Sequence, residues 1–129
     1  MSEPIRGVVR EGKGEGKTFT QLDWVREQFR LKVGFDPYPG TLNVQTSQRD
    51  QLAEWRTRQG IQIEPRPGYC AAVVLRVRVN GRIDAAWIIP FVPNYPTDVL
   101  ELMAGVSLRE TLGLVTGNQV SIELLEGAE

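Results

Sequence analysis

The sequence contains no histidine and a single cysteine, Cys70. The absence of histidine excludes a Ser-His-Asp triad, a histidine metal site and a histidine general base. One cysteine cannot form an internal disulfide, and without a second cysteine or a histidine beside it there is no zinc site. Cys70 lies in an apolar run, so we expect a small buried hydrophobic side chain. Acid–base chemistry must therefore use carboxylates, lysine, tyrosine or the substrate itself.

A strong net charge and long apolar runs are also lacking. The chain has 15 basic and 16 acidic residues, so no bulk field favours nucleic acid or an anionic membrane. No run approaches the length of a transmembrane helix, and the N-terminal residues have no apolar signal-peptide core. We therefore expect a cytoplasmic protein. Its 129 residues, 41% hydrophobic and 24% charged, are typical of one globular domain covering residues 1–129.

Prolines and glycines concentrate in residues 34–43, which read GFDPYPGTLN. Pro37 and Pro39 fix φ and remove two backbone donors, so this segment is neither a helix nor a central strand. Thr41 and Asn43 are two residues apart, so on an extended chain their side-chain oxygens share a face. Two neutral oxygens side by side on a stiff segment suit Mg²⁺. The same pattern is also that of a polar turn leading into a strand.

Glycines alternate with charged residues in residues 12–18, which read GKGEGKT. The backbone N–H groups of such a loop can converge on an anion. The segment is not a P-loop, because only three residues separate Gly12 from the Gly16-Lys17 pair and a Walker A motif has four. Residues 18–20 favour extended structure rather than the helix that a P-loop opens. A phosphate-binding loop and a simple hairpin tip remain as alternatives.

Four segments are predicted to be helical: residues 21–33, 48–59, 97–104 and 107–114. In the first, apolar residues recur at helical spacing, Asp23 is a candidate cap, and Trp24 is expected in the core. The last begins with a capping box, in which Ser107 is followed three residues later by Glu110. In the third, Glu101 stands in an apolar turn, so its carboxylate either faces solvent or is held for a purpose.

Strands are predicted for residues 5–9, 61–64, 70–80, 82–91 and 120–125, and for the chain that follows Thr41. The Asn80-Gly81 pair between two β-rich runs is a strong hairpin signal. Apolar residues alternate with Arg76 and Arg78, so one face of this hairpin is solvated. Strands dominate and no βαβ repeat is present. We therefore predict a mostly β fold, a small, closed, mainly antiparallel barrel with short helices at its ends.

The segment PYPGTLN, with GKGEGK upstream and LRETLGL downstream, resembles the archaeal-type CTP-dependent riboflavin kinases. The resemblance runs from about Ile5 to Leu125. It implies a small closed β-barrel of the riboflavin-kinase-like cradle-loop type, unrelated to P-loop kinases. It also implies transfer of the γ-phosphoryl group of CTP to the 5′-hydroxyl of riboflavin, giving FMN and CDP. Phosphoryl transfer depends on positioning and charge neutralisation, which suits a site without histidine.

The resemblance also implies roles for particular residues. The metal ligands would be Thr41 and Asn43, holding Mg²⁺. Glu101 would lie against the ribityl chain and orient the 5′-hydroxyl, and it is a candidate general base. The nucleotide would be held by Lys13, Gly14, Glu15, Gly16, Lys17 and Thr18 around the phosphates, and by Val106, Ser107, Leu108 and Arg109 around the base and ribose.

The flavin side departs from the family pattern, which has a Thr-Tyr pair in this loop. Here residues 93–97 read PNYPT, and Asn94 stands before Tyr95 in place of the hydroxyl residue. Either Asn94 or Thr97 would then contact the flavin. The expected partners are riboflavin or FMN and CTP or CDP, with no nucleic acid and no membrane, and the protein is expected to be a monomer without a DNA-binding extension.

Two other functions fit parts of the sequence. One is a nucleotide or flavin sensor that no longer transfers phosphate. The other is a DNA-binding barrel, because residues 112–124 (LGLVTGNQVSIEL) also resemble the closing hairpin of small swapped-hairpin barrels. The balanced charge supplies no clear basic stripe for DNA, although Arg76, Arg78 and Arg82 are close together in sequence.

Overall fold

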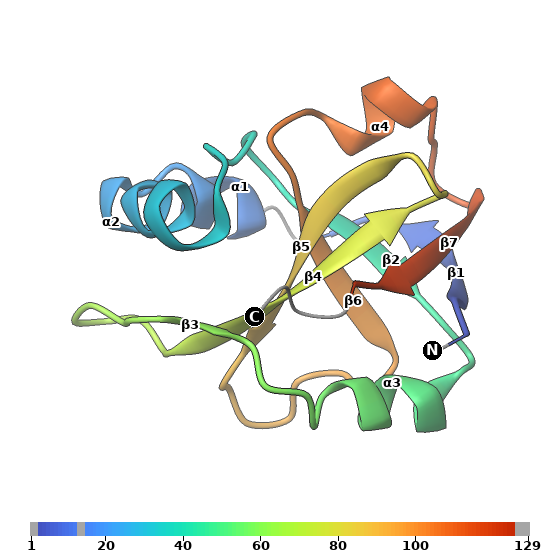
Figure 1. Ribbon diagram of the computed structural model, residues 1–129, viewed down its shortest axis with the longest axis horizontal. Coiled ribbons are helices and arrows are strands. Elements are labelled where there is room, and N and C mark those ends of the chain that lie inside the picture. Colours follow the sequence, from blue (N-terminus) through green and yellow to red (C-terminus); the bar gives the residue numbers. More distant parts are fainter. Residues whose placement is uncertain (1–2, 13–14, 126–129) are drawn as a thin grey trace.

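The computed structural model describes residues 3–12 and 15–125, in which strands alternate with short helices (Figure 1). The strands are β1 (Ile5–Arg10), β2 (Leu42–Gln45), β3 (Ile61–Ile63), β4 (Ala72–Val79), β5 (Ile83–Pro90), β6 (Val99–Met103) and β7 (Gln119–Leu124). The helical segments are α1 (Glu15–Thr20), α2 (Asp23–Gln28), the π-helix η1 (Phe29–Val33), α3 (Arg49–Trp55) and α4 (Leu108–Leu112).

Six strands form a closed antiparallel barrel in the order β4-β5-β6-β2-β1-β7. The barrel closes because β7 pairs with the second half of β4, where Val79 lies opposite Ile122. The short strand β3 pairs with the first half of β4, where Val74 lies opposite Ile61, so it extends the wall beyond the barrel. The predicted fold class, a small mainly antiparallel barrel, is confirmed.

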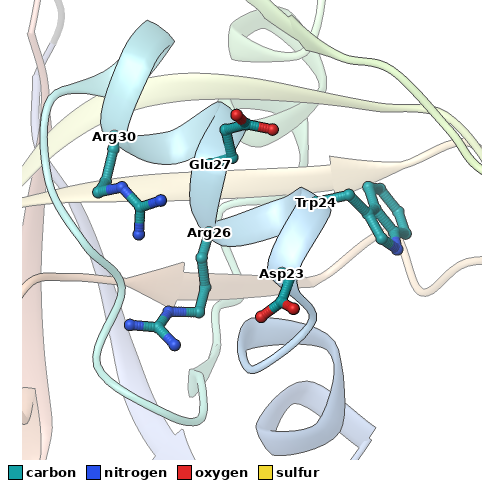
Figure 2. Close-up of a pocket in the computed structure, with 5 residues that line it drawn as sticks. All are labelled: Asp23, Trp24, Arg26, Glu27 and Arg30. Atoms are coloured by element: carbon teal, nitrogen blue, oxygen red, sulfur yellow. The ribbon is translucent and has the colours of Figure 1, made fainter.

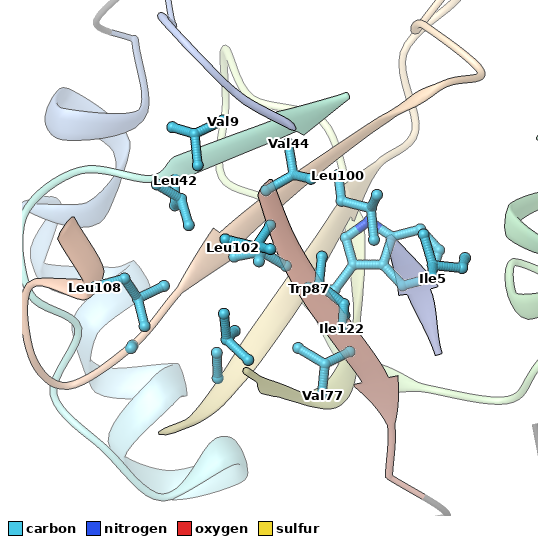
Figure 3. Close-up of a cluster of buried hydrophobic side chains, with 14 of the residues drawn as sticks. Ile5, Val9, Leu42, Val44, Val77, Trp87, Leu100, Leu102, Leu108 and Ile122 are labelled. Carbon is cyan, nitrogen blue, oxygen red and sulfur yellow. The ribbon is translucent and has the colours of Figure 1, made fainter. Parts of the chain in front are cut away.

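The barrel interior is filled by one face of every barrel strand. Side chains such as Leu42, Val44, Leu100 and Leu102 alternate with polar neighbours and converge around Trp87 (Figure 3). The two short helices α3 and α4 close opposite ends of the barrel (Figure 1). Each adds its apolar residues to the same core: Leu52, Trp55 and Leu108.

A second apolar cluster lies outside the barrel, between its wall and the helix formed by α2 and η1. Val25, Phe29 and Val33 pack there against wall residues that include Ile88 and Met103. Polar contacts fix the helix on the wall, because the Gln28 side chain donates to the Glu64 carbonyl at 3.0 Å and accepts from the Glu64 N–H at 2.7 Å. The helix therefore covers part of the outer wall, including Met103 on β6, while Asn43 on β2 and Glu101 on β6 stay partly exposed.

Two local predictions from the sequence are confirmed. The chain reverses at Asn80 and Gly81, which have φ of 53° and 65°, the positive values that a tight hairpin turn requires. Ser107 caps α4, since its hydroxyl accepts a hydrogen bond from the Glu110 N–H at 3.2 Å.

The predicted helix over residues 97–104 is wrong, because this segment contains β6. Its residues favour a helix intrinsically, yet Leu100 and Leu102 occupy the barrel interior with period two. Pairing with β2 and β5 on its two sides outweighs that preference, since without β6 the barrel wall would be open. Glu101 therefore lies on the outer face of a strand.

Three smaller predictions are also wrong. Residues 18–20 end the helix α1 instead of extending, and Phe19 of this helix packs edge-on against Trp24 with ring centroids 6.1 Å apart. Cys70 is exposed, because it precedes β4 in a segment outside the barrel wall. Asp23 is the first residue of α2 and does not cap it; the cap position is Leu22.

Across the described ranges, no helix has the length and apolar character needed to cross a membrane.

Gly7 provides a test of how closely β1 packs on β2. A Cβ at this position would lie 2.5 Å from Val44 Cγ1 and 2.7 Å from the Gln45 carbonyl oxygen. We expect Gly7→Ala to lower the free energy of unfolding by about 1–3 kcal/mol, measured by chemical denaturation. The matched control is Gly105→Ala, where the nearest atom, Phe35 Cβ, is 3.5 Å away, and there we expect a change within about 0.5 kcal/mol. Equal effects of the two substitutions would contradict this packing.

Candidate active site

Asn43 and Glu101 lie directly opposite each other on the paired strands β2 and β6. Their chain neighbours Leu42, Val44 and Leu100 are buried in the barrel, so the amide and the carboxylate share the outer face of the wall. Directly opposite residues of an antiparallel pair have Cβ atoms about 4.5–5.5 Å apart. The fold thus brings together a predicted metal ligand and the predicted catalytic carboxylate, 58 residues apart in the sequence.

The segment from Gly12 to Thr20, called the glycine segment below, begins against the Asn43 side chain. Arg10 is the register partner of Asn43 on β1, and Gly12 follows two residues later. A Cβ on Gly12 would lie 2.3 Å from Asn43 Nδ2, so the backbone at this point passes closer to the amide than any other residue type allows. Any larger residue at position 12 would therefore displace the Asn43 side chain.

The glycine segment also returns to the predicted metal ligands. Thr20, the last residue of α1, accepts a hydrogen bond on its hydroxyl from the Gly40 N–H at 2.8 Å. Gly40 directly precedes Thr41. The segment between Gly12 and Thr20 therefore has one end at Asn43 and the other beside Thr41.

The structure differs from the predicted phosphate loop in one respect. Glu15, Gly16, Lys17 and Thr18 belong to the helix α1 and do not form an extended loop. Lys13 and Gly14 lie outside the described residues. The second half of the predicted loop is therefore helical, as the start of α1.

Arg109 of α4 reaches the chain just before the glycine segment. Its Nη2 donates to the Arg10 carbonyl oxygen at 3.4 Å and lies 3.9 Å from Glu11 Oε2. Glu11 in turn accepts from the Thr116 hydroxyl at 2.5 Å. Of the other residues predicted for the nucleotide, Val106 is exposed, Ser107 caps α4, and Leu108 is buried in the barrel core, so Leu108 can offer a ligand only its backbone.

Tyr95, to which the sequence assigned no role of its own, contacts the predicted catalytic carboxylate. Its hydroxyl donates a hydrogen bond to Glu101 Oε1. Burial raises the pKa of the Tyr95 phenol above its ordinary value, and the hydrogen bond to Glu101 and the charge of that carboxylate raise it further. The phenol is therefore protonated at neutral pH. The mistaken helix over residues 97–104 concealed this contact, since the strand β6 is what places Glu101 on the outer wall beside Tyr95.

The loop that carries Tyr95 is held by Arg56, which follows α3. Its Nη1 and Nη2 donate to the carbonyl oxygens of Thr97 and Pro96, each at 3.2 Å. The same guanidinium lies over the Trp87 ring, 5.9 Å from its centroid. Asn94 and Thr97, the predicted flavin contacts, are exposed on this loop, and Asn94 has a φ of 61°.

The donor set fits Mg²⁺. Thr41 and Asn43 are partly exposed while Leu42 and Val44 are buried, so the expected alternation of side chains is present. Their hydroxyl and amide oxygens are hard oxygen ligands, and neither carries a charge. Among the described residues, no three aspartate, glutamate or cysteine side chains gather into a metal site. A cation here would therefore keep positions for water and phosphate oxygens.

Two surface depressions lie outside this group, since neither is lined by Thr41, Asn43 or Glu101. One is on the exposed side of α2 (Figure 2), where Arg26 donates to Asp36 at 2.9 Å and forms an ion pair with it. The other lies along the outer face of β1 and β2, where Arg10 Nε donates to Gln45 Oε1 at 2.9 Å. Its charged lining residues are Arg6, Arg10, Arg49 and Asp98.

The fold and the site define a small closed β-barrel that carries an amide–carboxylate pair on its outer wall. Residues 9–124 match a family model named CTP-dep_RFKase and described as domain of unknown function DUF120. The chain belongs to this family.

Several curated relatives are named riboflavin kinase. The protein of Archaeoglobus fulgidus is 38% identical over 130 residues, covering 94% of this chain and 54% of the relative. That of Methanocella arvoryzae is 42% identical over 123 residues, covering 93% and 56%. That of Methanothermobacter thermautotrophicus is 35% identical over 117 residues, covering 90% and 94%. The chain thus spans about half the length of the first two relatives and nearly all of the third.

The close approach of Gly12 to Asn43 can be tested without an activity. We expect Gly12→Ala to displace the Asn43 side chain, because a methyl group and Nδ2 cannot occupy positions 2.3 Å apart. The Asn43 side-chain amide resonances should shift in the ¹H–¹⁵N NMR spectrum, while the free energy of unfolding changes by less than about 1 kcal/mol because a flexible side chain moves. Gly105→Ala is again the control. Unchanged Asn43 resonances in Gly12→Ala would contradict the contact.

Proposed function

We propose that this protein transfers the γ-phosphoryl group of CTP to the 5′-hydroxyl of riboflavin, giving FMN and CDP, with Mg²⁺ as the metal. The observation that carries this proposal is the register pair of Asn43 and Glu101, because it puts the amide proposed as a metal ligand beside a carboxylate on the outer wall. The relatives named riboflavin kinase support riboflavin as the acceptor. The family name supports CTP as the donor.

Thr41 and Asn43 would hold Mg²⁺ through neutral oxygens. When bound, the ion would neutralise the charge that builds up on the phosphate oxygens during transfer. Because neither ligand is charged, little of the cation's charge is offset by the protein. Gly12, whose backbone lies against the Asn43 amide, keeps that side chain in one place.

The nucleotide phosphates would lie along the glycine segment, whose two ends border on Asn43 and Gly40. Backbone N–H groups from such a segment bind anions without a Walker A sequence. Arg109, fixed against the Arg10 carbonyl, adds a cation at the start of the segment.

Glu101 would accept a hydrogen bond from the 5′-hydroxyl of riboflavin and direct it toward the phosphorus atom. A loose transition state requires little early proton removal, so orientation is the main task of this carboxylate. Asn94 and Thr97, on the exposed loop before β6, are the proposed contacts for the rest of the flavin substrate.

The direct experiment incubates the purified protein with riboflavin, Mg²⁺ and each of CTP, ATP, GTP and UTP, and follows FMN by chromatography. We expect FMN with CTP and Mg²⁺, and loss of product when EDTA removes the metal. If FMN formed with ATP instead of CTP, riboflavin phosphorylation would be supported but CTP as the phosphate donor would be contradicted. No FMN with any nucleotide, from folded protein, would overturn the proposed function.

Glu101→Gln tests the role of the carboxylate. We expect kcat to fall by about 10²-fold or more, because a neutral amide oxygen is a weaker hydrogen-bond acceptor for the 5′-hydroxyl than a charged carboxylate. Binding of CTP, measured by calorimetry, should change by less than about threefold, since Glu101 is on the acceptor side. Glu123→Gln, an exposed carboxylate on β7, is the matched control and should leave kcat unchanged. Equal small losses of turnover and CTP binding in Glu101→Gln would contradict the assignment.

A further inference from the structure

We propose that Tyr95 is a positioning residue for this transfer: its hydroxyl holds one carboxylate oxygen of Glu101, so that the other oxygen is presented to the acceptor hydroxyl. This inference rests on the proposed function. It assigns a role to Tyr95, which contacts Glu101 and not the substrate. It also assigns a role to Arg56, which holds the loop that carries Tyr95.

The need for such a contact follows from the geometry of the glutamate side chain. Rotation of a carboxylate about its last bond has broad, roughly two-fold minima, so the strand alone does not set the plane of the Glu101 carboxylate. On one side its register partner is Asn43, and on the other it is Ile88, which offers no hydrogen bond. The Tyr95 hydroxyl supplies a directional donor to Oε1 and thereby fixes that plane.

The Tyr95 phenol is suited to remain a donor. It is partly buried, and both its burial and the adjacent Glu101 carboxylate favour the neutral phenol. A phenol has one proton to donate, and here that proton is directed at Oε1. The second oxygen, Oε2, is the one that remains for the substrate.

The position of Tyr95 is itself determined by its loop. Pro93 and Pro96 restrict the backbone on both sides, and Asn94 takes a φ of 61°, which is uncommon for a residue other than glycine. Arg56 binds the carbonyl oxygens of Pro96 and Thr97 from the end of α3, whose Trp55 is buried in the barrel core.

The end of the same loop is attached to β2. The Asp98 carboxylate accepts from Gln45 Nε2 at 2.9 Å, and its carbonyl oxygen accepts from the Thr46 N–H at 2.9 Å. Gln45 is two residues beyond Asn43 on the same face of that strand. The loop is therefore bound both to α3 and to the strand that carries the proposed metal ligand, and it holds the Tyr95 hydroxyl in a fixed relation to both.

Tyr95→Phe keeps the aromatic ring and removes the donor. We expect kcat for FMN formation to fall by about tenfold, because the carboxylate is no longer held in the productive orientation. The dissociation constants of riboflavin, followed by flavin fluorescence, and of CTP should change by less than about twofold, since neither ligand loses a contact. Tyr69→Phe, an exposed tyrosine packed on Trp24, is the matched control and should behave as the wild type.

A double-mutant cycle separates positioning from a general structural role. If Tyr95 acts through Glu101, Tyr95→Phe should cause no further loss of kcat in a Glu101→Gln background. Arg56→Lys removes the paired hydrogen bonds to the carbonyl oxygens of Pro96 and Thr97. As a single substitution it should lower kcat, and in a Glu101→Gln background it should have no further effect. This second variant keeps the test valid if Tyr95→Phe does not fold.

The outcomes distinguish this inference from the proposed function. FMN from the wild type with an unchanged kcat in Tyr95→Phe would overturn the role of Tyr95 and leave the function intact. An equal loss from Tyr95→Phe with and without Glu101→Gln would also overturn it, because the two residues would then act independently. No FMN from the folded wild type would overturn both.

Discussion

The register of β2 between β1 and β6 is the constraint on which the site depends. It places Arg10, Asn43 and Glu101 in one row across the barrel wall. Side chains alternate between the two faces of a strand, so a slip of one residue would turn Asn43 into the core and Leu42 outward. The burial of Leu42, Val44, Leu100 and Leu102 makes that slip costly. The same hydrophobic residues that stabilise the barrel therefore determine which polar side chains meet on its surface.

One part of the outer barrel wall packs against a helix, and the part next to it carries the residues proposed for catalysis. The helix formed by α2 and η1 covers Ile88 and Met103, which neighbour Glu101 on β5 and β6, whereas Asn43 and Glu101 themselves stay partly exposed. The glycine segment, α4 and the loop before β6 approach the row of Asn43 and Glu101 from different elements. Each is attached by a specific contact: Gly12 against Asn43, Arg109 on the Arg10 carbonyl, and Tyr95 on Glu101. Groups far apart in the sequence thus gather along one row of the barrel wall.

Local signals in the sequence predicted the barrel and most of its turns. Pro37, Pro39 and the Asn80-Gly81 pair limit the backbone by their own chemistry, so these predictions do not depend on distant residues. β6 was missed because its leucines and Glu101 favour a helix in isolation, and only pairing with β2 and β5 makes it a strand. Tyr95 was missed for the same reason, since its contact exists only when Glu101 lies on that strand. The residues proposed for metal and acceptor were predicted individually, but their proximity depends on tertiary pairing.

The central claim is that Asn43 binds the metal and Glu101 binds the acceptor hydroxyl, side by side in one row of the barrel wall. A crystal structure of the protein with Mg²⁺, CDP and FMN tests it most directly. The account predicts the metal on Thr41 and Asn43, with the phosphate ester oxygen of FMN within hydrogen-bonding distance of Glu101. A complex in which FMN binds away from Glu101, or in which the metal has neither Thr41 nor Asn43 as a ligand, would contradict it.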